Sequence, residues 1–228
     1  MRRKKPIPSV ENLSIEGIAK KGKGVGRTPD GQVVFVQGAI PGDVIDVDVQ
    51  KKRRRHLEGK VSHFHKESSD RITPKCVHFG TCGGCTWQHM NYEAQLRHKQ
   101  QEVSDALNRI GGVDLAEFTP IIGCKNTYGY RNKMEFSFSA RRWLTPEEIN
   151  GSEPVTDKTA LGFHIPGMFD KVIDVKKCYL QKDPSNDIRI SIKEFALKNR
   201  LSFFDIKKQE GLLRNLMIRT STTGDLMV

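Results

Sequence analysis

Apolar and polar residues alternate in several short segments of the first third of the chain. The alternation is clearest over residues 44–49, where Val44, Ile45, Val47 and Val49 surround two aspartates. A period of two places one side of a β-strand in a core and the other side in solvent. Further short apolar runs of this kind occur at residues 13–18, 32–36 and 56–63. The first third of the chain is therefore predicted to be built from short strands.

The segments between these runs have the composition of turns. Asp30-Gly31 and Pro41-Gly42-Asp43 are typical of tight turns, and we expect the glycines at 22, 24 and 26 to form a loop. Residues 51–55 are predicted to be a basic loop. Five short strands joined in this way predict a small OB-like β-barrel over residues 9–66.

The pattern changes after residue 90. Apolar residues at Leu96, Val103, Leu107 and Ile110 form one stripe of a helix predicted over residues 92–110. Further on, Met134, Phe136 and Phe138 alternate with polar residues and predict a strand. We also expect a polar loop at residues 147–157 and short strands at residues 159–164 and 171–175. A helix over residues 183–198 and a final strand over residues 212–220 should follow. These elements predict an α+β domain with an antiparallel sheet over residues 67–228, so that the chain as a whole is mainly β.

The charge of the chain is positive and unevenly distributed. The formal net charge is +11, of which residues 1–75 contribute +8. We expect residues 1–8 to be a solvated basic arm, but the excess within a folded segment is typical of proteins that bind polyanions, and nucleic acid is the expected partner. No apolar stretch approaches the roughly 20 residues of a membrane span, and no secretory signal is apparent. We therefore expect a cytoplasmic protein that does not contact membranes.

OB-like barrels bind single-stranded nucleic acid with basic side chains on phosphates and aromatic rings on bases. Phe35 is a candidate ring, although its strand position fits a core role equally well. Outside the barrel, Arg131 and Lys133 are either RNA contacts or ordinary solvated charges at the start of a strand. The basic candidates within the barrel are Lys23, Arg27, Lys51, Lys52, Arg53, Arg54 and Arg55.

Cysteines provide the most distinctive pattern. Cys76, Cys82 and Cys85 lie within ten residues, in a segment that contains glycines, and Cys178 follows far downstream. Soft sulfur ligands select zinc or iron–sulfur centres, and the spacing alone leaves both open. The fifth cysteine, Cys124, has no partner base in the sequence and is expected to be a spectator. We expect surface or packing roles for His63, His65, His78 and His89.

Several of these motifs together resemble a known family. The segments Gly22–Arg27, Asp30-Gly31 and Pro41–Val44 resemble a TRAM domain. The pattern Cys-x5-Cys-Gly-Gly-Cys-x-Trp-Gln, which begins at Cys76, resembles the bacterial 23S ribosomal RNA uracil-5-methyltransferases. Weaker matches continue to Arg219, so the resemblance covers nearly the whole chain.

The resemblance implies a cofactor and a larger protein. It assigns a 4Fe–4S cluster to Cys76, Cys82, Cys85 and Cys178, with zinc as the alternative. It also implies a C-terminal Rossmann-like domain that binds S-adenosylmethionine and carries the catalytic residues, which we do not find in these residues. We therefore expect an inactive N-terminal portion of a monomeric RNA uracil-5-methyltransferase, whose helix at 92–110 packs in a core or docks on the catalytic domain in cis.

Two other functions stay open at this point. The first is a self-contained RNA-binding protein that zinc stabilises. The second is a radical enzyme that cleaves S-adenosylmethionine, but such enzymes resemble Cys-x3-Cys-x2-Cys, whereas this chain has five residues in the first gap. Ribosomal RNA is the expected substrate, and the sequence does not identify the uridine.

Overall fold

The structure is a computed structural model that describes residues 9–228 except 115–116 and 153–154, and the side chains of residues 146–147 are also not described. The basic arm predicted at residues 1–8 lies outside the described residues. None of the helices in the described part of the chain is long and apolar enough to cross a membrane.

The chain divides into two compact units, which we describe separately. The barrel unit consists of residues 1–75 and 86–123, and the cysteine unit consists of residues 76–85 and 124–228. The chain therefore leaves the barrel unit for the loop with three cysteines, which belongs to the cysteine unit, and then returns to the barrel unit. The predicted domain boundary between residues 66 and 67 stays a prediction.

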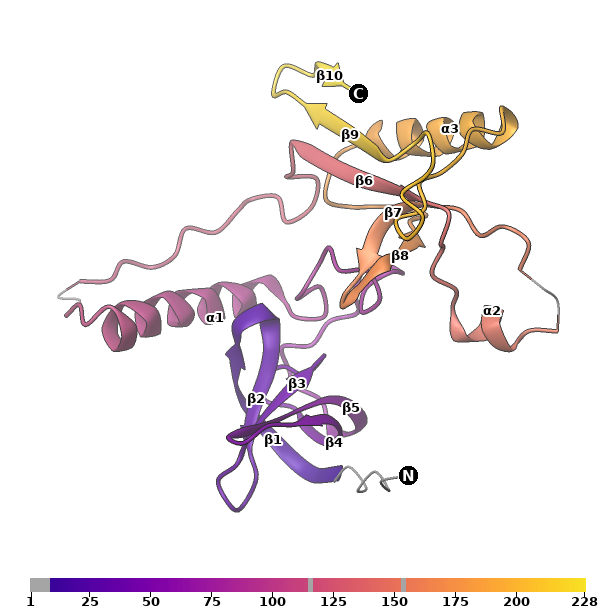
Figure 1. Cartoon of the computed structure of the whole chain (residues 1–228). Helices are drawn as coiled ribbons and strands as arrows, with labels where there is room; N and C mark the ends of the chain where they lie inside the picture. The colour runs from indigo at the N-terminus through magenta and orange to yellow at the C-terminus, as the bar shows by residue number, and fades with distance from the viewer. Residues whose placement is uncertain (1–8, 115–116, 153–154) are drawn as a thin grey trace. The chain divides into compact units, whose positions relative to one another are not determined.

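The barrel unit contains the closed five-stranded barrel that the alternating pattern predicts (Figure 1). The strands follow the order β1-β2-β3-β5-β4 around the barrel, and β3 pairs with β5 in parallel while the other pairs are antiparallel. The strands are β1 (Ser9–Ala19), β2 (Lys23–Arg27), β3 (Val33–Gln37), β4 (Val44–Lys52) and β5 (His56–Lys66).

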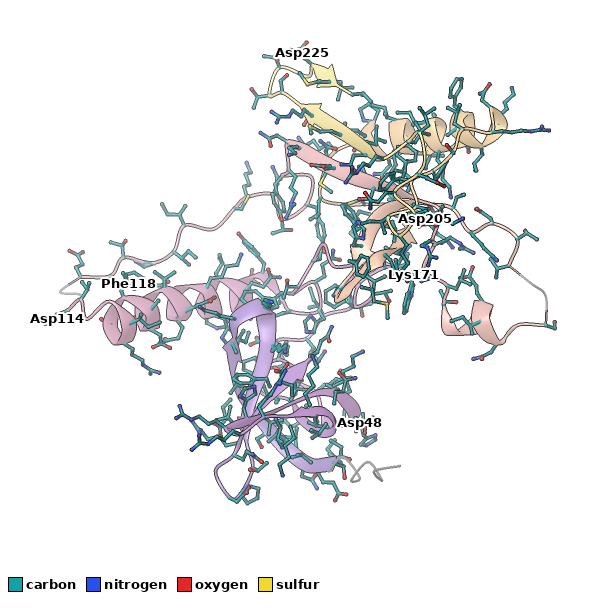
Figure 2. The ribbon with its side chains drawn as sticks, in the orientation of Figure 1. Asp48, Asp114, Phe118, Lys171, Asp205 and Asp225 are labelled. Atoms are coloured by element: carbon teal, nitrogen blue, oxygen red, sulfur yellow. The ribbon has the colours of Figure 1, made fainter. Side chains whose placement is uncertain are left out.

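The inside of the barrel is filled with aliphatic side chains. Every second residue of β3 and β4 points inward, and Val34, Val36, Ile45 and Val47 are fully buried. Full burial of one such side chain contributes about 1.5–3 kcal/mol. Asp48 lies on the opposite face of β4 and is exposed (Figure 2). The alternation in the sequence therefore predicts both faces of this strand correctly.

One buried carboxylate fixes the turn between β3 and β4. Asp43 is fully buried and accepts hydrogen bonds from the backbone N–H groups of Ile40 (2.7 Å) and Ser68 (2.9 Å). Arg71 donates to both of its oxygens, at 2.8 Å and 2.6 Å. The Pro41-Gly42-Asp43 turn is confirmed, and Asp43 ties it to the chain that leaves the barrel.

The loop predicted for the glycines at 22, 24 and 26 is wrong in its second half. A short 3-10 turn, η1 (Lys20–Gly22), leads directly into β2, which contains Gly24 and Gly26. A Cβ atom at Gly24 would lie 2.8 Å from the Ala39 carbonyl oxygen, and one at Gly26 would lie 2.4 Å from the Ser14 carbonyl oxygen. These glycines are present because the backbones of neighbouring segments approach closely.

The helix predicted over residues 92–110 is confirmed as two consecutive segments, α1 (Tyr92–Asp105) and the π-helical η2 (Ala106–Ile110). Asn91 caps its start by accepting a hydrogen bond from the Ala94 N–H at 2.8 Å. The apolar stripe is not a core face along its length, because Val103 is 48% exposed and Ile110 is 83% exposed. Ordinary core packing therefore does not account for the far end of this helix.

The cysteine unit contains the predicted antiparallel sheet, with strands in the order β10-β9-β6-β7-β8. The helix α3 (Ser185–Lys198) covers one face of it (Figure 1). Met134, Phe136 and Phe138 of β6 are buried against Ala196 of α3, as the alternation predicts. The strands are β6 (Lys133–Ser139), β7 (Ala160–Ile165), β8 (Met168–Asp174), β9 (Asn215–Thr220) and β10 (Leu226–Met227).

The polar loop predicted over residues 147–157 is partly wrong. A short helix, α2 (Pro146–Asn150), occupies its beginning. Thr145 accepts a hydrogen bond from the Glu148 N–H at 3.3 Å, and the Glu148 carboxylate accepts one from the Thr145 N–H at 2.9 Å. This reciprocal capping box is visible in the sequence as Thr-x-x-Glu, so the helix start could have been found.

Candidate metal centre and nucleic-acid interface

The loop that carries three cysteines is wound tightly by its own backbone. The N–H of Phe79 donates to the carbonyl of Cys76 at 3.0 Å, and the N–H of Cys82 donates to the carbonyl of His78 at 2.8 Å. Gly80 has a φ of 85°, a left-handed conformation that glycine adopts without strain. The sequence therefore predicts the tight turn correctly.

Cys178 is held in place by a side chain from α3. Asn186 accepts a hydrogen bond from the Cys178 N–H at 2.8 Å and donates one to the Cys178 carbonyl at 3.0 Å. Asn186 is itself buried. The peptide group on either side of Cys178 is thus fixed by one amide, which positions its thiol relative to the helix.

A histidine joins the two cysteine-bearing segments. His78, in the first loop, accepts a hydrogen bond through Nε2 from the Lys176 N–H at 2.8 Å. The pKa of His78 lies below its ordinary value because burial disfavours the charged ring and because Lys176 and Arg189 are close. A neutral ring is the form that can accept this bond. The predicted packing role of His78 is therefore a specific one, which the sequence did not indicate.

The four predicted ligands lie within electrostatic reach of one another. Burial raises the pKa of the Cys82 thiol against one hydrogen bond from the Gly84 N–H, and with the contributions of the Cys85, Cys178 and Cys76 thiols the pKa reaches about 11. Burial also raises the pKa of Cys178, and Cys85 and Cys76 again contribute. The structure thus brings these residues, which we call the cysteine quartet, to one region of the cysteine unit.

The surroundings of the cysteine quartet are apolar on one side. Cys82 and Cys178 both pack against a cluster formed by Ile165, Ile173 and Val175. The aromatic ring of Tyr128 also lies near, since the pKa of its hydroxyl is raised by burial first and then by Cys85 and Cys76. Such a shell excludes water from the thiols and controls access to whatever they hold.

The chemistry of the quartet is that of soft sulfur donors. Among the described residues, no three His, Cys, Asp or Glu side chains form a group that could hold a metal ion as they stand. The four side chains are partly buried, and two of them lie beside apolar residues. Zinc and iron–sulfur centres both use such thiolates, so the donor set fits either kind of centre.

Cys124 lies in the cysteine unit. Its side chain is exposed, and its thiol donates a hydrogen bond to the Asn126 carbonyl at 3.0 Å. Its role as a spectator stays a prediction.

In the barrel unit, Phe35 lies on the outer face of β3 and is half-buried. It is absent from the barrel core and meets the ring of His56 edge to face, with 5.2 Å between ring centroids. Of its two predicted roles, the core role is therefore wrong. A partly exposed ring on the outside of a barrel is suitable for stacking a base.

The basic candidates of the barrel unit differ in their exposure and in their ion pairs. Lys23 and Arg27 lie on the same face of β2, but Lys23 forms an ion pair with Glu58, with 2.6 Å between Nζ and Oε2. Arg27 is exposed, and so are five candidates at the end of β4 and in the turn that follows it, namely Lys51, Lys52, Arg53, Arg54 and Arg55. The ion pair with Glu58 partly neutralises the charge of Lys23. The β4–β5 turn is therefore the stronger candidate for phosphate binding.

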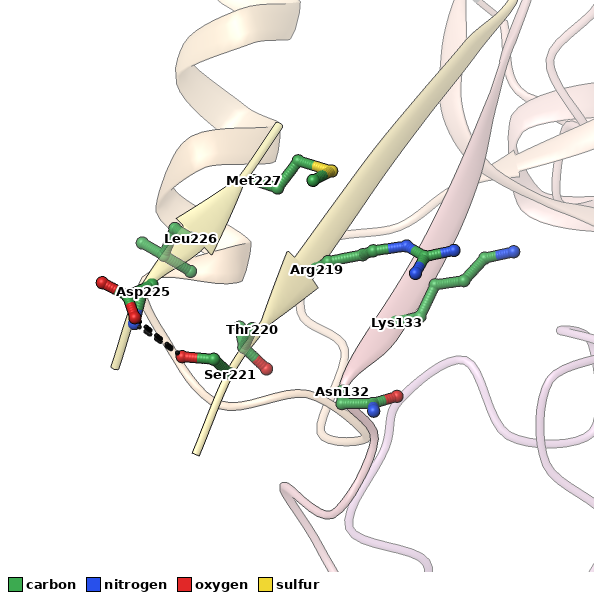
Figure 3. A pocket seen from close by; sticks show the side chains of 8 residues that line it. All are labelled: Asn132, Lys133, Arg219, Thr220, Ser221, Asp225, Leu226 and Met227. Atoms are coloured by element: carbon green, nitrogen blue, oxygen red, sulfur yellow. Dashed lines mark hydrogen bonds between the residues drawn. The ribbon is translucent and has the colours of Figure 1, made fainter. Parts of the chain in front are cut away.

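In the cysteine unit, Arg131 and Lys133 are both exposed. Lys133 lines a pocket of about 370 Å³ and is the cross-strand neighbour of Arg219. Figure 3 shows the two cationic side chains extending alongside each other, with Leu226 and Met227 also at the pocket. Arg219 was not predicted as a site residue, although its outward position follows from the alternation of Leu216, Ile218 and their neighbours.

Comparison with known proteins adds information of three kinds. The family model of the TRAM domain matches residues 8–62. A protein from Porphyromonas gingivalis described as an uncharacterized RNA methyltransferase is 47% identical over 95% of this chain and 47% of its own length. One from Bacteroides thetaiotaomicron with the same description is 46% identical over 92% of this chain and 46% of its own length.

A solved structure shares the fold. The Pyrococcus abyssi tRNA (uracil-54, C5)-methyltransferase, in complex with S-adenosyl-L-homocysteine, matches with a TM-score of 0.62 and 23% identity. The match covers 94% of this chain and 44% of that protein. The chain thus contains a match to the TRAM domain and is similar, over nearly all of its own length but about half of theirs, to proteins described as RNA methyltransferases.

Proposed function

We propose that this chain is the RNA-binding, iron–sulfur-containing portion of an RNA uracil-5-methyltransferase that uses S-adenosylmethionine. The observation that carries the proposal is the similarity to RNA methyltransferases over 92% and 95% of the chain. The fold shared with a uracil-C5 methyltransferase supports carbon 5 of uracil as the methylated atom.

RNA binding is the part of the function that these residues would perform. Base stacking on an aromatic ring contributes about 1–3 kcal/mol, and Phe35 with its neighbour His56 offers such a ring. The exposed arginines 53–55 would neutralise phosphates nearby on the same unit. Enzymes that modify a base first take it out of its stack, which costs a few kcal/mol. Contacts of this kind offset that free energy while they select the RNA.

The cysteine quartet is proposed to hold a 4Fe–4S cluster. Four partly buried soft donors beside apolar side chains support a metal–sulfur centre, and the sequence resemblance is the reason we propose iron–sulfur instead of zinc. Bound by four cysteines, such a cluster supplies a cross-link and leaves no open iron for substrate. The residues of this chain would do the rest: Asn186 orients Cys178, and the backbone of the 76–85 loop orients the other three thiols.

We place methyl transfer and the S-adenosylmethionine site in the part of the related proteins that this chain does not match, which is about half of their length. Ribosomal RNA, specifically 23S, is the substrate we propose, and it rests on the sequence resemblance. We accordingly expect the 228-residue chain to bind RNA as a monomer without transferring methyl groups.

One experiment tests both parts. RNA labelled with tritium at carbon 5 of uridine releases tritium when that carbon is methylated. A longer protein that contains this chain is expected to release tritium from 23S RNA in the presence of S-adenosylmethionine, whereas the 228-residue chain is expected to bind the same RNA without release. Methylation at another atom, or release from transfer RNA but not from 23S RNA, would contradict the activity or the substrate respectively.

The cofactor is tested separately. Protein purified without oxygen is expected to show broad visible absorption and about four irons per chain. A colourless protein with stoichiometric zinc would replace the cluster by the zinc alternative.

A further inference from the structure

A fully buried arginine lies close to the cysteine quartet. Arg189, on α3, is only 1% exposed and is the largest fully buried side chain in the described part of the protein. Its Nη2 donates a hydrogen bond to the Lys176 carbonyl at 2.9 Å, two residues before Cys178. The guanidinium also faces the ring of Phe136, 5.6 Å from the ring centroid. Burial of a cation costs several kcal/mol unless a negative charge compensates it.

The hydrogen bonding of this arginine is incomplete. Its Nε is buried and has no hydrogen-bond partner among the described residues. Buried donors are nearly always satisfied, so an orphaned N–H on a permanently charged group indicates an acceptor that belongs next to it. That acceptor should carry negative charge.

The acidic side chain that acts on Arg189 already has other hydrogen-bond partners. The carboxylate of Asp174 acts on Arg189 through its negative charge. Asp174 receives the Lys193 ammonium on Oδ2 at 2.8 Å and the Leu161 N–H on Oδ1 at 2.9 Å. The same guanidinium is bonded through Nη2 to the Lys176 carbonyl, two residues before Cys178, so the cation lies beside the segment that carries this thiol.

We propose that Arg189 is the buried counter-cation of the cysteine quartet. Four thiolates around a metal–sulfur centre give that centre a net negative charge, and the guanidinium offsets it without contact with solvent. The Nε–H is the donor available to a sulfur of the centre. The inference rests on the proposed metal–sulfur function of the quartet, and it assigns a positioning and charge-tuning role to a residue outside the ligand set.

The neighbouring groups are consistent with this role. His78 accepts a hydrogen bond from the N–H of Lys176, and Arg189 donates to the carbonyl of the same residue, so both hold the approach to Cys178. Asn186, which lies three residues before Arg189 on the same helix face, holds Cys178 itself. The inner face of α3 therefore provides the amide that fixes a ligand and the cation that balances its charge.

Replacement of the charge tests the proposal. Arg189→Met removes the cation while keeping an unbranched apolar side chain, Arg189→Lys keeps the charge, and Lys198→Met removes an exposed cation from the end of the same helix as a control. All proteins are purified without oxygen, and iron content, visible absorption, the midpoint reduction potential and the rate of iron loss to a chelator are measured.

Loss of a nearby cation disfavours the reduced, more negative centre. We expect Arg189→Met to lower the midpoint potential by at least ~59 mV, which corresponds to a tenfold change in a one-electron equilibrium. Iron loss should be at least tenfold faster. Arg189→Lys should fall between Arg189→Met and the unchanged protein, and Lys198→Met should match the unchanged protein.

The outcomes separate the two proposals. A parent chain without iron or visible absorption contradicts the cluster itself. A parent chain with a cluster, together with an Arg189→Met variant of unchanged potential and iron loss, overturns the role of Arg189 alone. If Arg189→Met retains no iron, Arg189→Lys decides: recovery of the cluster supports the charge, and a second iron-free protein shows a merely structural arginine.

Discussion

The barrel unit and the cysteine unit are stabilised in different ways. The barrel core consists of aliphatic side chains such as Val34, Val36 and Ile45, which are fully buried and need no partner beyond one another. In the cysteine unit, apolar packing against β6 is accompanied by buried Asn186 and Arg189 and by partly buried thiols. The first core is explained by apolar packing alone, whereas the second contains a buried cation, Arg189, with one N–H that has no partner among the described residues.

Each unit also carries one tryptophan, Trp87 in the barrel unit and Trp143 in the cysteine unit, among the two that the chain contains. Variants that replace one of them by phenylalanine let fluorescence follow the other unit alone. Each unit can therefore be changed and its unfolding followed separately from that of the other unit.

The largest effect is expected from Cys178→Ala. Loss of one quartet thiol should lower bound iron more than tenfold and remove the cooperative unfolding transition seen by Trp143, which packs in the same apolar cluster as Cys178. The transition seen by Trp87 should not change. The matched control is Cys124→Ala, which should retain iron, and equal iron in both variants would contradict the assignment of Cys178.

In the barrel unit, Asp43→Ala should have the next largest effect. It leaves the buried end of Arg71 and two backbone N–H groups without their acceptor. Removal of one partner of a buried ion pair costs about 3–5 kcal/mol. Urea unfolding followed by Trp87 measures this loss, with exposed Asp48→Ala as the control within about 0.5 kcal/mol of the parent. Similar free energies of unfolding for both variants would show that the hydrogen bonds of Asp43 do not stabilise the barrel.

The barrel unit should also lose stability in mild acid through His89. Burial, followed by the positive charge of Arg71, lowers the pKa of His89 to about 4, and Asp43 opposes this only in part. Between pH 6.5 and 4 the unfolded chain binds a proton at this residue and the folded chain does not, so stability is constant above pH 6.5 and falls as the pH decreases. The full loss is roughly 3 kcal/mol.

Urea unfolding at several pH values, followed by Trp87, measures this dependence. His89→Gln should flatten the curve between pH 6.5 and 4. A slope that the substitution leaves unchanged would assign the acid sensitivity to other groups.

Substitutions in the β4–β5 turn should have the smallest effect on stability. Their effect should be on RNA binding. Replacement of Arg53, Arg54 and Arg55 by glutamine should change stability by no more than about 0.5 kcal/mol, because all three are exposed. The slope of log affinity for RNA against log salt concentration should flatten by about 2, since fewer counterions are released. Glutamines at three exposed cations of the cysteine unit, Lys198, Arg200 and Lys208, give a matched control for net charge.

Much of the fold follows from local pattern in the sequence. The alternation of Met134, Phe136 and Phe138 predicts β6 and its buried face because burial of every second residue is a property of the strand itself. The strand that contains Gly24 and Gly26 was missed because its cause is distant: the glycines avoid carbonyl groups of Ala39 and Ser14. Turn composition alone does not distinguish these two uses of glycine.

The candidate site divides in the same way. Cysteine spacing leads to three of the four proposed ligands, because close thiols in a short loop can meet without reference to the rest of the fold, and the ligand role itself stays a prediction. The residues that support them were not predicted, since Asn186, Arg189 and His78 act on partners 8, 13 and 98 residues away. Contacts over such separations depend on the register of β8 and α3, which the sequence pattern does not provide.

The long separation between the parts of the quartet has a consequence for biosynthesis. Ribosomes add about 5–20 residues per second, so the 93 residues from Thr86 to Cys178 take about 5 to 20 s to synthesise. During this time three thiols have emerged, or are emerging, without the fourth, and the helix that orients it does not yet exist. Nascent chains are therefore exposed to oxidants at this stage, and the cluster that we propose could be inserted only after translation has passed residue 198.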